Sequence, residues 1–177
     1  DQLCSIANKE FKIWNLQGLV KEDHLRIDSL VGFQYLPSKN YLMVASRNGM
    51  INFYNNDGLK TKAKVNCEHA LDFAFIDKQG ENIIVTTEDS LVLVIPTDGG
   101  QSFSYSMPER CLSGDISVDK NHILMGGESG LIYLLNRKNS KCTVYRGLKG
   151  RVAAVQFHPT RNMFAACSNE MTGAGIP

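Results

Sequence analysis

Short apolar runs separated by turn-forming residues extend along the whole chain. Residues 29–58 show the pattern most clearly, with three runs of Val, Ile, Leu, Phe and Tyr between clusters of Pro, Asn, Asp and Gly. Such runs are typical of β-strands joined by tight turns. Asn48-Gly49 favours a hairpin, because both residues tolerate a positive φ. Residues 59–67 predict a fourth strand, since apolar or small residues alternate there with Lys60, Lys62, Lys64 and Asn66.

This four-strand unit recurs about every forty residues. The residue that ends its third strand falls at Trp14, Tyr54, Ile95 and Leu135, in steps of 40, 41 and 40. The turns before and after that strand recur at the same spacings, and the turn after the first strand recurs at nearly the same spacings. A repeat of this length with four strands is typical of a β-propeller, in which each unit forms one blade.

The third strand of the unit resembles that of the WD-repeat family, which ends in Trp-Asp. Residues 11–15 read Phe-Lys-Ile-Trp-Asn, and residues 51–55 and 132–136 are weaker copies. The resemblance implies an all-β fold, a β-propeller of four-stranded antiparallel WD-repeat-like blades or part of one.

The family also joins a His, a Ser or Thr, an Asp and the Trp by hydrogen bonds inside a blade. The third unit offers His69, Thr87 and Asp89 for this group, with Ile95 in place of the Trp. Glu68-His69 stands where the family has Gly-His. The resemblance therefore implies that packing holds these blades together where the hydrogen-bonded group is incomplete.

We interpret residues 1–177 as part of a single β-propeller domain. The predicted units are a partial one at residues 1–27, then 28–67, 69–108 and 111–150, and a partial one at 151–169. WD-repeat propellers usually have more blades, so we expect the chain to be a piece of a longer protein. Residues 171–177 do not continue the repeat.

The third unit allows a more detailed prediction of strand faces. Leu71, Phe73 and Phe75 alternate with small or polar residues and are expected to share one face of a first, innermost strand. Residues 91–95 are apolar throughout, which is typical of a strand covered on both faces. Pro96 cannot donate to a sheet and should end that strand.

Composition is that of an ordinary soluble globular domain, with 43% hydrophobic and 21% charged residues. No apolar run approaches the roughly 18 residues that a membrane span needs. The opening residues already follow the strand pattern, so no signal peptide is expected. The five cysteines lack Cys-x-x-Cys spacing. We interpret them as reduced thiols of an intracellular protein, in the nucleus or cytoplasm.

Motifs for catalysis or cofactor binding are absent from the sequence, so we expect neither an enzyme nor a cofactor, metal or small-molecule substrate. Cys67 and His69 could supply two metal ligands, but nothing in the sequence supplies the others. The alternative is a buried thiol beside a blade-capping His. Cys4 and Cys167 take the same position in second strands, and both are interpreted as small buried hydrophobic residues.

Charge is distributed unevenly along the chain. Residues 69–128 contain ten acids and three Lys or Arg, whereas residues 129–169 contain seven Lys or Arg and no acid. Six of these bases are candidate binding residues, predicted to lie on one blade margin facing a phosphate backbone or an acidic protein: Arg137, Lys138, Lys141, Arg146, Lys149 and Arg151. The alternative is a solvated outer strand whose charges discourage edge pairing.

These patterns favour a binding function over catalysis, because propeller blades present many loops on a rigid body. The leading prediction is a non-catalytic scaffold that binds other proteins within a multi-subunit intracellular complex. The alternative is a ribonucleoprotein subunit, in ribosome biogenesis or RNA processing, that contacts RNA through its basic blade edge. A third hypothesis, an enzyme that uses the propeller channel, lacks any supporting motif. No membrane partner is expected.

Overall fold

The computed structural model describes residues 2–7, 10–15, 17–24, 29–55, 58–64 and 70–169. Over these residues the regular structure consists of antiparallel β-strands, which confirms the predicted all-β class. Each strand pairs with the next strand in the chain, so every sheet is a simple meander.

Five sheets follow one another along the chain. The first contains β1 (Gln2–Ala7), β2 (Glu10–Asn15) and β3 (Gly18–His24). The second contains β4 (Leu30–Leu36), β5 (Tyr41–Ser46), β6 (Met50–Asn55) and β7 (Gly58–Lys64). The third contains β8 (Leu71–Ile76), β9 (Asn82–Thr87), β10 (Leu91–Pro96) and β11 (Phe103–Ser106). The fourth contains β12 (Cys111–Ile116), β13 (His122–Gly127), β14 (Ile132–Asn136) and β15 (Cys142–Tyr145). The last contains β16 (Val152–Phe157) and β17 (Phe164–Ser168).

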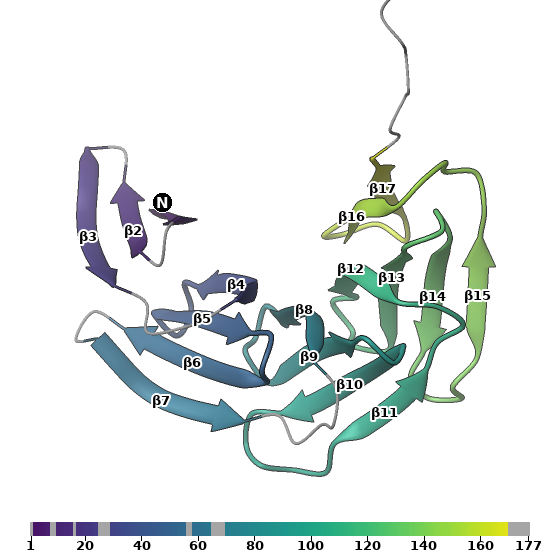
Figure 1. Ribbon diagram of the computed structural model, residues 1–177, viewed down its shortest axis with the longest axis horizontal. Coiled ribbons are helices and arrows are strands. Elements are labelled where there is room, and N and C mark those ends of the chain that lie inside the picture. Colours follow the sequence, from purple (N-terminus) through teal and green to yellow (C-terminus); the bar gives the residue numbers. More distant parts are fainter. Residues whose placement is uncertain are drawn as a thin grey trace, which may run out of the picture.

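The sheets lie side by side along an open arc (Figure 1). The first strands β4, β8, β12 and β16 lie on its inner side, where each contacts the next. The outer strands β7, β11 and β15 form its rim. Close approach of the inner strands requires small residues. A Cβ on Gly32 of β4 would lie 2.0 Å from the carbonyl oxygen of Ala74 in β8.

The units are equivalent in register as well as in order. A β-bulge interrupts the pairing near the start of the inner strand in four successive units, between Leu30 and Gly32, Leu71 and Phe73, Cys111 and Ser113, and Val152 and Ala154. The four residues predicted to end the third strands also hold one register position, opposite the second residue of the strand before: Trp14 opposite Leu3, Tyr54 opposite Leu42, Ile95 opposite Ile83, and Leu135 opposite Ile123. The forty-residue period of the sequence therefore corresponds to a structural unit that repeats in strand order and register.

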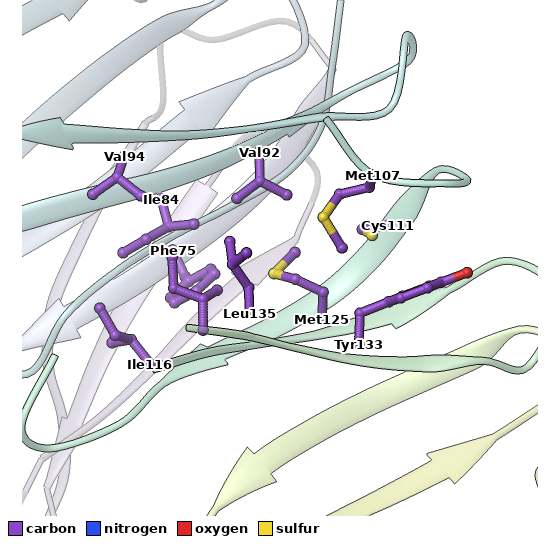
Figure 2. Packing of buried hydrophobic residues seen from close by; sticks show 11 residues of the cluster. Phe75, Ile84, Val92, Val94, Met107, Cys111, Ile116, Met125, Tyr133 and Leu135 are labelled. Carbon is purple, nitrogen blue, oxygen red and sulfur yellow. The ribbon is translucent and has the colours of Figure 1, made fainter. Parts of the chain in front are cut away.

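Apolar clusters fill the space between neighbouring sheets. Met43, Ile51 and Ile83 belong to the cluster between the second and third sheets. Figure 2 shows the next cluster, in which Ile84 and Val92 of the third sheet meet Met125 and Leu135 of the fourth. A smaller cluster around Leu124 and Val155 joins the fourth sheet to the last. Each described four-stranded sheet from β8 onward is thus covered on both faces, as the apolar run at residues 91–95 predicts.

Two burial predictions are wrong. Leu71 packs with Ala74 and Ile76, on the opposite face from Phe73 and Phe75. The bulge after Leu71 adds one residue to the strand, and one extra residue moves a side chain to the other face. Cys167 is exposed, because β17 is the outer strand of a sheet in which only two strands are described.

Ionic contacts also join successive sheets along the edge at which the β5–β6 turn lies. Arg110, which precedes β12, donates from Nε and Nη2 to the two carboxylate oxygens of Asp72 in β8, at 2.8 and 2.6 Å. Arg47, after β5, approaches the same carboxylate at 3.8 Å and pairs with Glu88. The hydrogen bond to Asp72 raises the pKa of Arg110. Because the Asp72 side chain is only 2% exposed, these contacts supply the partners that a buried charge requires.

Most predicted strands agree with the structure to within one or two residues. Pro96 ends β10, as predicted, whereas the bounds of β11, the fourth strand of that unit, were not predicted. Glu68, His69 and residues 171–177 lie outside the described residues, so the predictions made for them stay predictions.

Candidate partner-binding surface

The outer strand β15 and its two flanking connections carry the six candidate bases. All four residues of β15 are exposed. Lys138 and Lys141 lie in the turn before it, and Arg146, Lys149 and Arg151 lie in the loop after it. These five side chains are exposed, which is the property that a binding surface needs.

The turn that carries Lys138 and Lys141 has a defined backbone. The Asn136 side chain accepts a hydrogen bond from the Lys138 amide at 2.9 Å, and the Asn139 side chain accepts one from the Lys141 amide at 3.0 Å. Ser140 adopts a positive φ of 55°. Asn and Ser favour such turns because their short polar side chains bond to nearby backbone. We call Lys138 and Lys141 the turn group.

The other three exposed bases lie at the far end of the strand. Arg146, Lys149 and Arg151, the loop group, belong to a connection that packs over the β13–β14 turn. At that turn Gly130 has a φ of 90°, and a Cβ on it would lie 2.7 Å from the carbonyl oxygen of Leu148. Five residues of extended chain separate Lys141 from Arg146, or about 16 Å. The five exposed bases therefore form two groups, one at each end of β15.

Arg137 differs from the other candidates, because it is half-buried. Its Nη1 donates to the carbonyl oxygen of Lys120 at 3.0 Å, and its backbone amide donates to Asn121 at 2.8 Å. Its Nε is buried without a hydrogen-bond partner among the described residues. Arg137 thus links β14 to the β12–β13 turn, so only part of its guanidinium is available to a partner.

Acidic residues in the same half of the protein have structural partners. The buried Asp77 accepts hydrogen bonds from the backbone amides of Glu81 and Asn82, at 2.8 and 3.1 Å. Asp119 accepts from Ser117 Oγ at 2.6 Å and from Asn121 Nδ2 at 2.7 Å. These bonds lower the pKa of Asp119 to about 2. Asp77 is thus buried in its turn, whereas Asp119 lies in an exposed turn and keeps its negative charge at the surface.

Glu109 makes another such group of contacts, at the sequence position one repeat after His69. Its carboxylate accepts from Ser129 N and Oγ at 2.9 and 2.7 Å and from the Tyr133 hydroxyl at 2.9 Å. Burial and this carboxylate raise the pKa of Tyr133. Burial, with a smaller contribution from Glu109, raises the pKa of Cys111 to about 12. In the third unit Thr87 donates to Asp89, two members of the group that the WD-repeat resemblance implies.

A pocket of about 290 Å³ opens beside the turn group. Phe103 and Tyr105 of β11 line one side of it, and the β12–β13 turn with Arg137 and Lys138 lines the other. Phe103 is 47% exposed. Sequence reasoning missed this pocket because it did not locate the fourth strand of this unit. The alternation of aromatic and serine residues at 103–106 is the signal that could have revealed the strand.

The inner strands enclose a second, larger hollow of about 580 Å³. Phe33 and Phe73 contribute apolar surface to it, and Gln34, Asp115 and Gln156 contribute polar groups. Its position on the inner side of the arc is the one expected of a propeller channel.

No group of three or more His, Cys, Asp or Glu side chains in the described part of the chain is arranged to hold a metal ion. Nor do the described residues include a helix long and apolar enough to cross a membrane. Comparison with profiles of known protein families gives no match, and comparison with curated protein sequences gives none either.

Proposed function

We propose that the chain is part of a WD-repeat-like β-propeller and serves as a non-catalytic scaffold that binds other proteins in a multi-subunit intracellular complex. Two features support the propeller. Successive units share one strand order, one register and one bulge position. Their inner strands also contact one another in sequence along the arc, as blades around an axis do.

The observation that carries the binding function is the group of exposed bases around β15. Lys138, Lys141 and Lys149 are exposed on the two sides of this strand, and residues 129–169 contain no acid. A rigid body of packed sheets then presents an excess of positive charge at both ends of β15. Such a surface favours an acidic partner, because complementary charge accelerates association and disfavours partners of the wrong sign.

Affinity purification of the full-length protein tests this function. Reversal of the turn group, Lys138→Glu with Lys141→Glu, is expected to reduce recovery of one or more partners. The difference from the native protein should shrink as salt is raised, because salt screens the charges on which the native protein relies. The melting temperature should change little, because exposed charges contribute little to folding. Arg161→Glu, an exposed base in the β16–β17 turn, is the matched control. Equal recovery with the double variant and the native protein would contradict the proposal.

The excess of bases in residues 129–169 also supports the second candidate, contact with RNA. Nuclease treatment before purification separates the two. Partners that stay bound after RNA is digested are held by protein contacts. Partners that are lost, together with binding of a single-stranded oligonucleotide that falls steeply with salt, would favour the ribonucleoprotein function.

A further inference from the structure

The outer strand β11 is an exposed edge that lacks the usual protection against pairing. It is the last strand of its sheet, with β10 on one side and no described strand on the other. An edge strand presents unpaired N–H and C=O groups to any extended chain that approaches it. Its sequence is Phe-Ser-Tyr-Ser, with no charge and no proline.

The two other rim strands have bases within or directly beside them. β7 carries Lys60, Lys62 and Lys64, whereas β15, Cys-Thr-Val-Tyr, is uncharged but is flanked directly by Lys141 and Arg146. Lysines on an edge disfavour strand addition, because they would have to lose hydration or lie close to the incoming chain. Among these rim strands β11 is therefore the one whose sequence permits an added strand.

The pocket beside β11 gives such a strand a place for its side chains. Phe103 and Tyr105 are two residues apart, so both point to the same face, toward the fourth sheet. Tyr105 packs against the cluster shown in Figure 2, while Phe103 remains largely exposed at the pocket wall. A flat, exposed aromatic side chain next to a pocket suits contact with an apolar side chain.

The opposite wall carries a small excess of positive charge. Lys120 is paired with Glu81, and the exposed Asp119 carboxylate keeps its negative charge while it accepts from Ser117 and Asn121. Arg137 and Lys138 supply two positive charges, one more than Asp119 offsets. Lys141 follows in the same turn and adds to this excess.

We propose that β11 and this pocket bind an extended, acidic segment of a partner protein. The segment pairs with β11 as a fifth strand, and its acidic side chains face Arg137 and Lys138. Alternate residues of an added strand point to the same side, so acidic or apolar residues at every second position fit the pocket. An RNA strand has no backbone that could extend the β-ladder, and the edge therefore favours a peptide. This inference rests on the proposed scaffold function and identifies its partner.

A photo-crosslinking experiment tests the site in the full-length protein. The photoreactive residue p-benzoylphenylalanine replaces Phe103, and in a control it replaces Tyr145, an aromatic residue of β15 that is 39% exposed. The probe is a short peptide of alternating glutamate and valine. Crosslinking is expected at position 103 and not at 145. A peptide with lysine for glutamate, and one N-methylated at alternate residues, should each crosslink about tenfold less, because they lose the charge and the ladder respectively.

Two charge reversals, tested separately, show which basic residues contact the peptide. Lys138→Glu should reduce crosslinking at position 103 about tenfold, whereas Lys149→Glu in the loop group should leave it within about twofold. Four outcomes overturn the inference: equal crosslinking by the N-methylated peptide, an equal effect of Lys149→Glu, an equal yield at position 145, or competition by an oligo-uridine. If partners of the full-length protein are lost with the turn-group reversal but not with Phe103→Ala, the scaffold function stands and this site is wrong.

Discussion

The carboxylate of Asp115 in β12 accepts a hydrogen bond from the backbone amide of Phe157 in β16, with 2.7 Å between Oδ2 and N. Gln34 in β4 makes the equivalent bond to Ile76 in β8, at 3.1 Å. In both pairs the donor follows the acceptor by 42 residues. The same side-chain position therefore ties an inner strand to the next one in two different places along the arc. This bond belongs to the contact between units and not to any single sheet.

Removal of the Asp115 carboxylate should weaken the contact between the fourth and fifth sheets. Asp115 also accepts from the Ile116 amide at 2.8 Å, so Asp115→Ala leaves two amides without this acceptor. We expect a loss of about 1–3 kcal/mol in the free energy of unfolding, measured with urea. Asp98→Ala is the control, because Asp98 is exposed and its one described bond is to Gly100 within its own turn. A loss no larger than the roughly 0.5 kcal/mol typical of a surface substitution would contradict this role.

Truncation of the third-strand residues tests the packing between sheets. Leu135 is 2% exposed and lies in the cluster between the third and fourth sheets, so Leu135→Ala should cost about 2–5 kcal/mol. Ile95 holds the equivalent register position but is only partly buried, so Ile95→Ala should cost less than Leu135→Ala. Urea unfolding monitored by circular dichroism gives both values. A larger loss for Ile95→Ala than for Leu135→Ala would contradict the deeper burial of Leu135.

Asp119 should make stability depend on acidity. Hydrogen bonds from Ser117 and Asn121 lower its pKa in the folded protein to about 2, below the value of about 3.9 in an unfolded chain. A lowered pKa means that the ionised carboxylate stabilises the fold above about pH 4, and that this contribution is lost as the pH falls toward 2. The difference in unfolding free energy between the native protein and Asp119→Ala should therefore shrink over this range. A difference independent of pH would show that the carboxylate charge does not matter.

The three described cysteines should differ in reactivity. Cys111 is buried and its pKa is raised to about 12, whereas Cys142 and Cys167 are exposed. Partial desolvation also raises the pKa of Cys142, although its side chain is exposed. Iodoacetamide at about pH 8, followed by peptide mass spectrometry, should modify Cys142 and Cys167 in the native protein and Cys111 only in denaturant, because the thiolate is the reactive form. Rapid modification of Cys111 in the native protein would contradict its place in the core.

Much of the fold can be predicted from the sequence, because strands and turns are local. Turns such as Asn48-Gly49 mark where strands end, and the forty-residue period places equivalent strands. The face of Leu71 could not be predicted, since one bulged residue reverses the alternation and leaves no mark in composition. The position of β11 within its four-strand unit could not be predicted, because two of its four residues are serine, which is less typical of strands than β-branched or aromatic residues.

The candidate surface was predicted less well, because charge along a sequence does not reveal what each charge contacts. Arg137 and Lys138 are neighbours in sequence, yet the Arg137 guanidinium bonds to the Lys120 carbonyl, whereas the Lys138 side chain is exposed. Bases that are close in number, such as Lys141 and Arg146, lie at opposite ends of a strand. The pocket combines Phe103 with Lys138, 35 positions later in the numbering, and only packing between sheets brings them together.

An experimental structure of the full-length protein tests the central claim most directly, that these repeated units are blades of a propeller that binds partners at its rim. We expect the sheets β4–β7, β8–β11 and β12–β15 to lie in consecutive order around a closed central axis, with β4, β8, β12 and β16 nearest to it and β11 exposed at the rim. Sheets that do not surround an axis, or a β11 edge covered by the protein's own chain, would contradict the account.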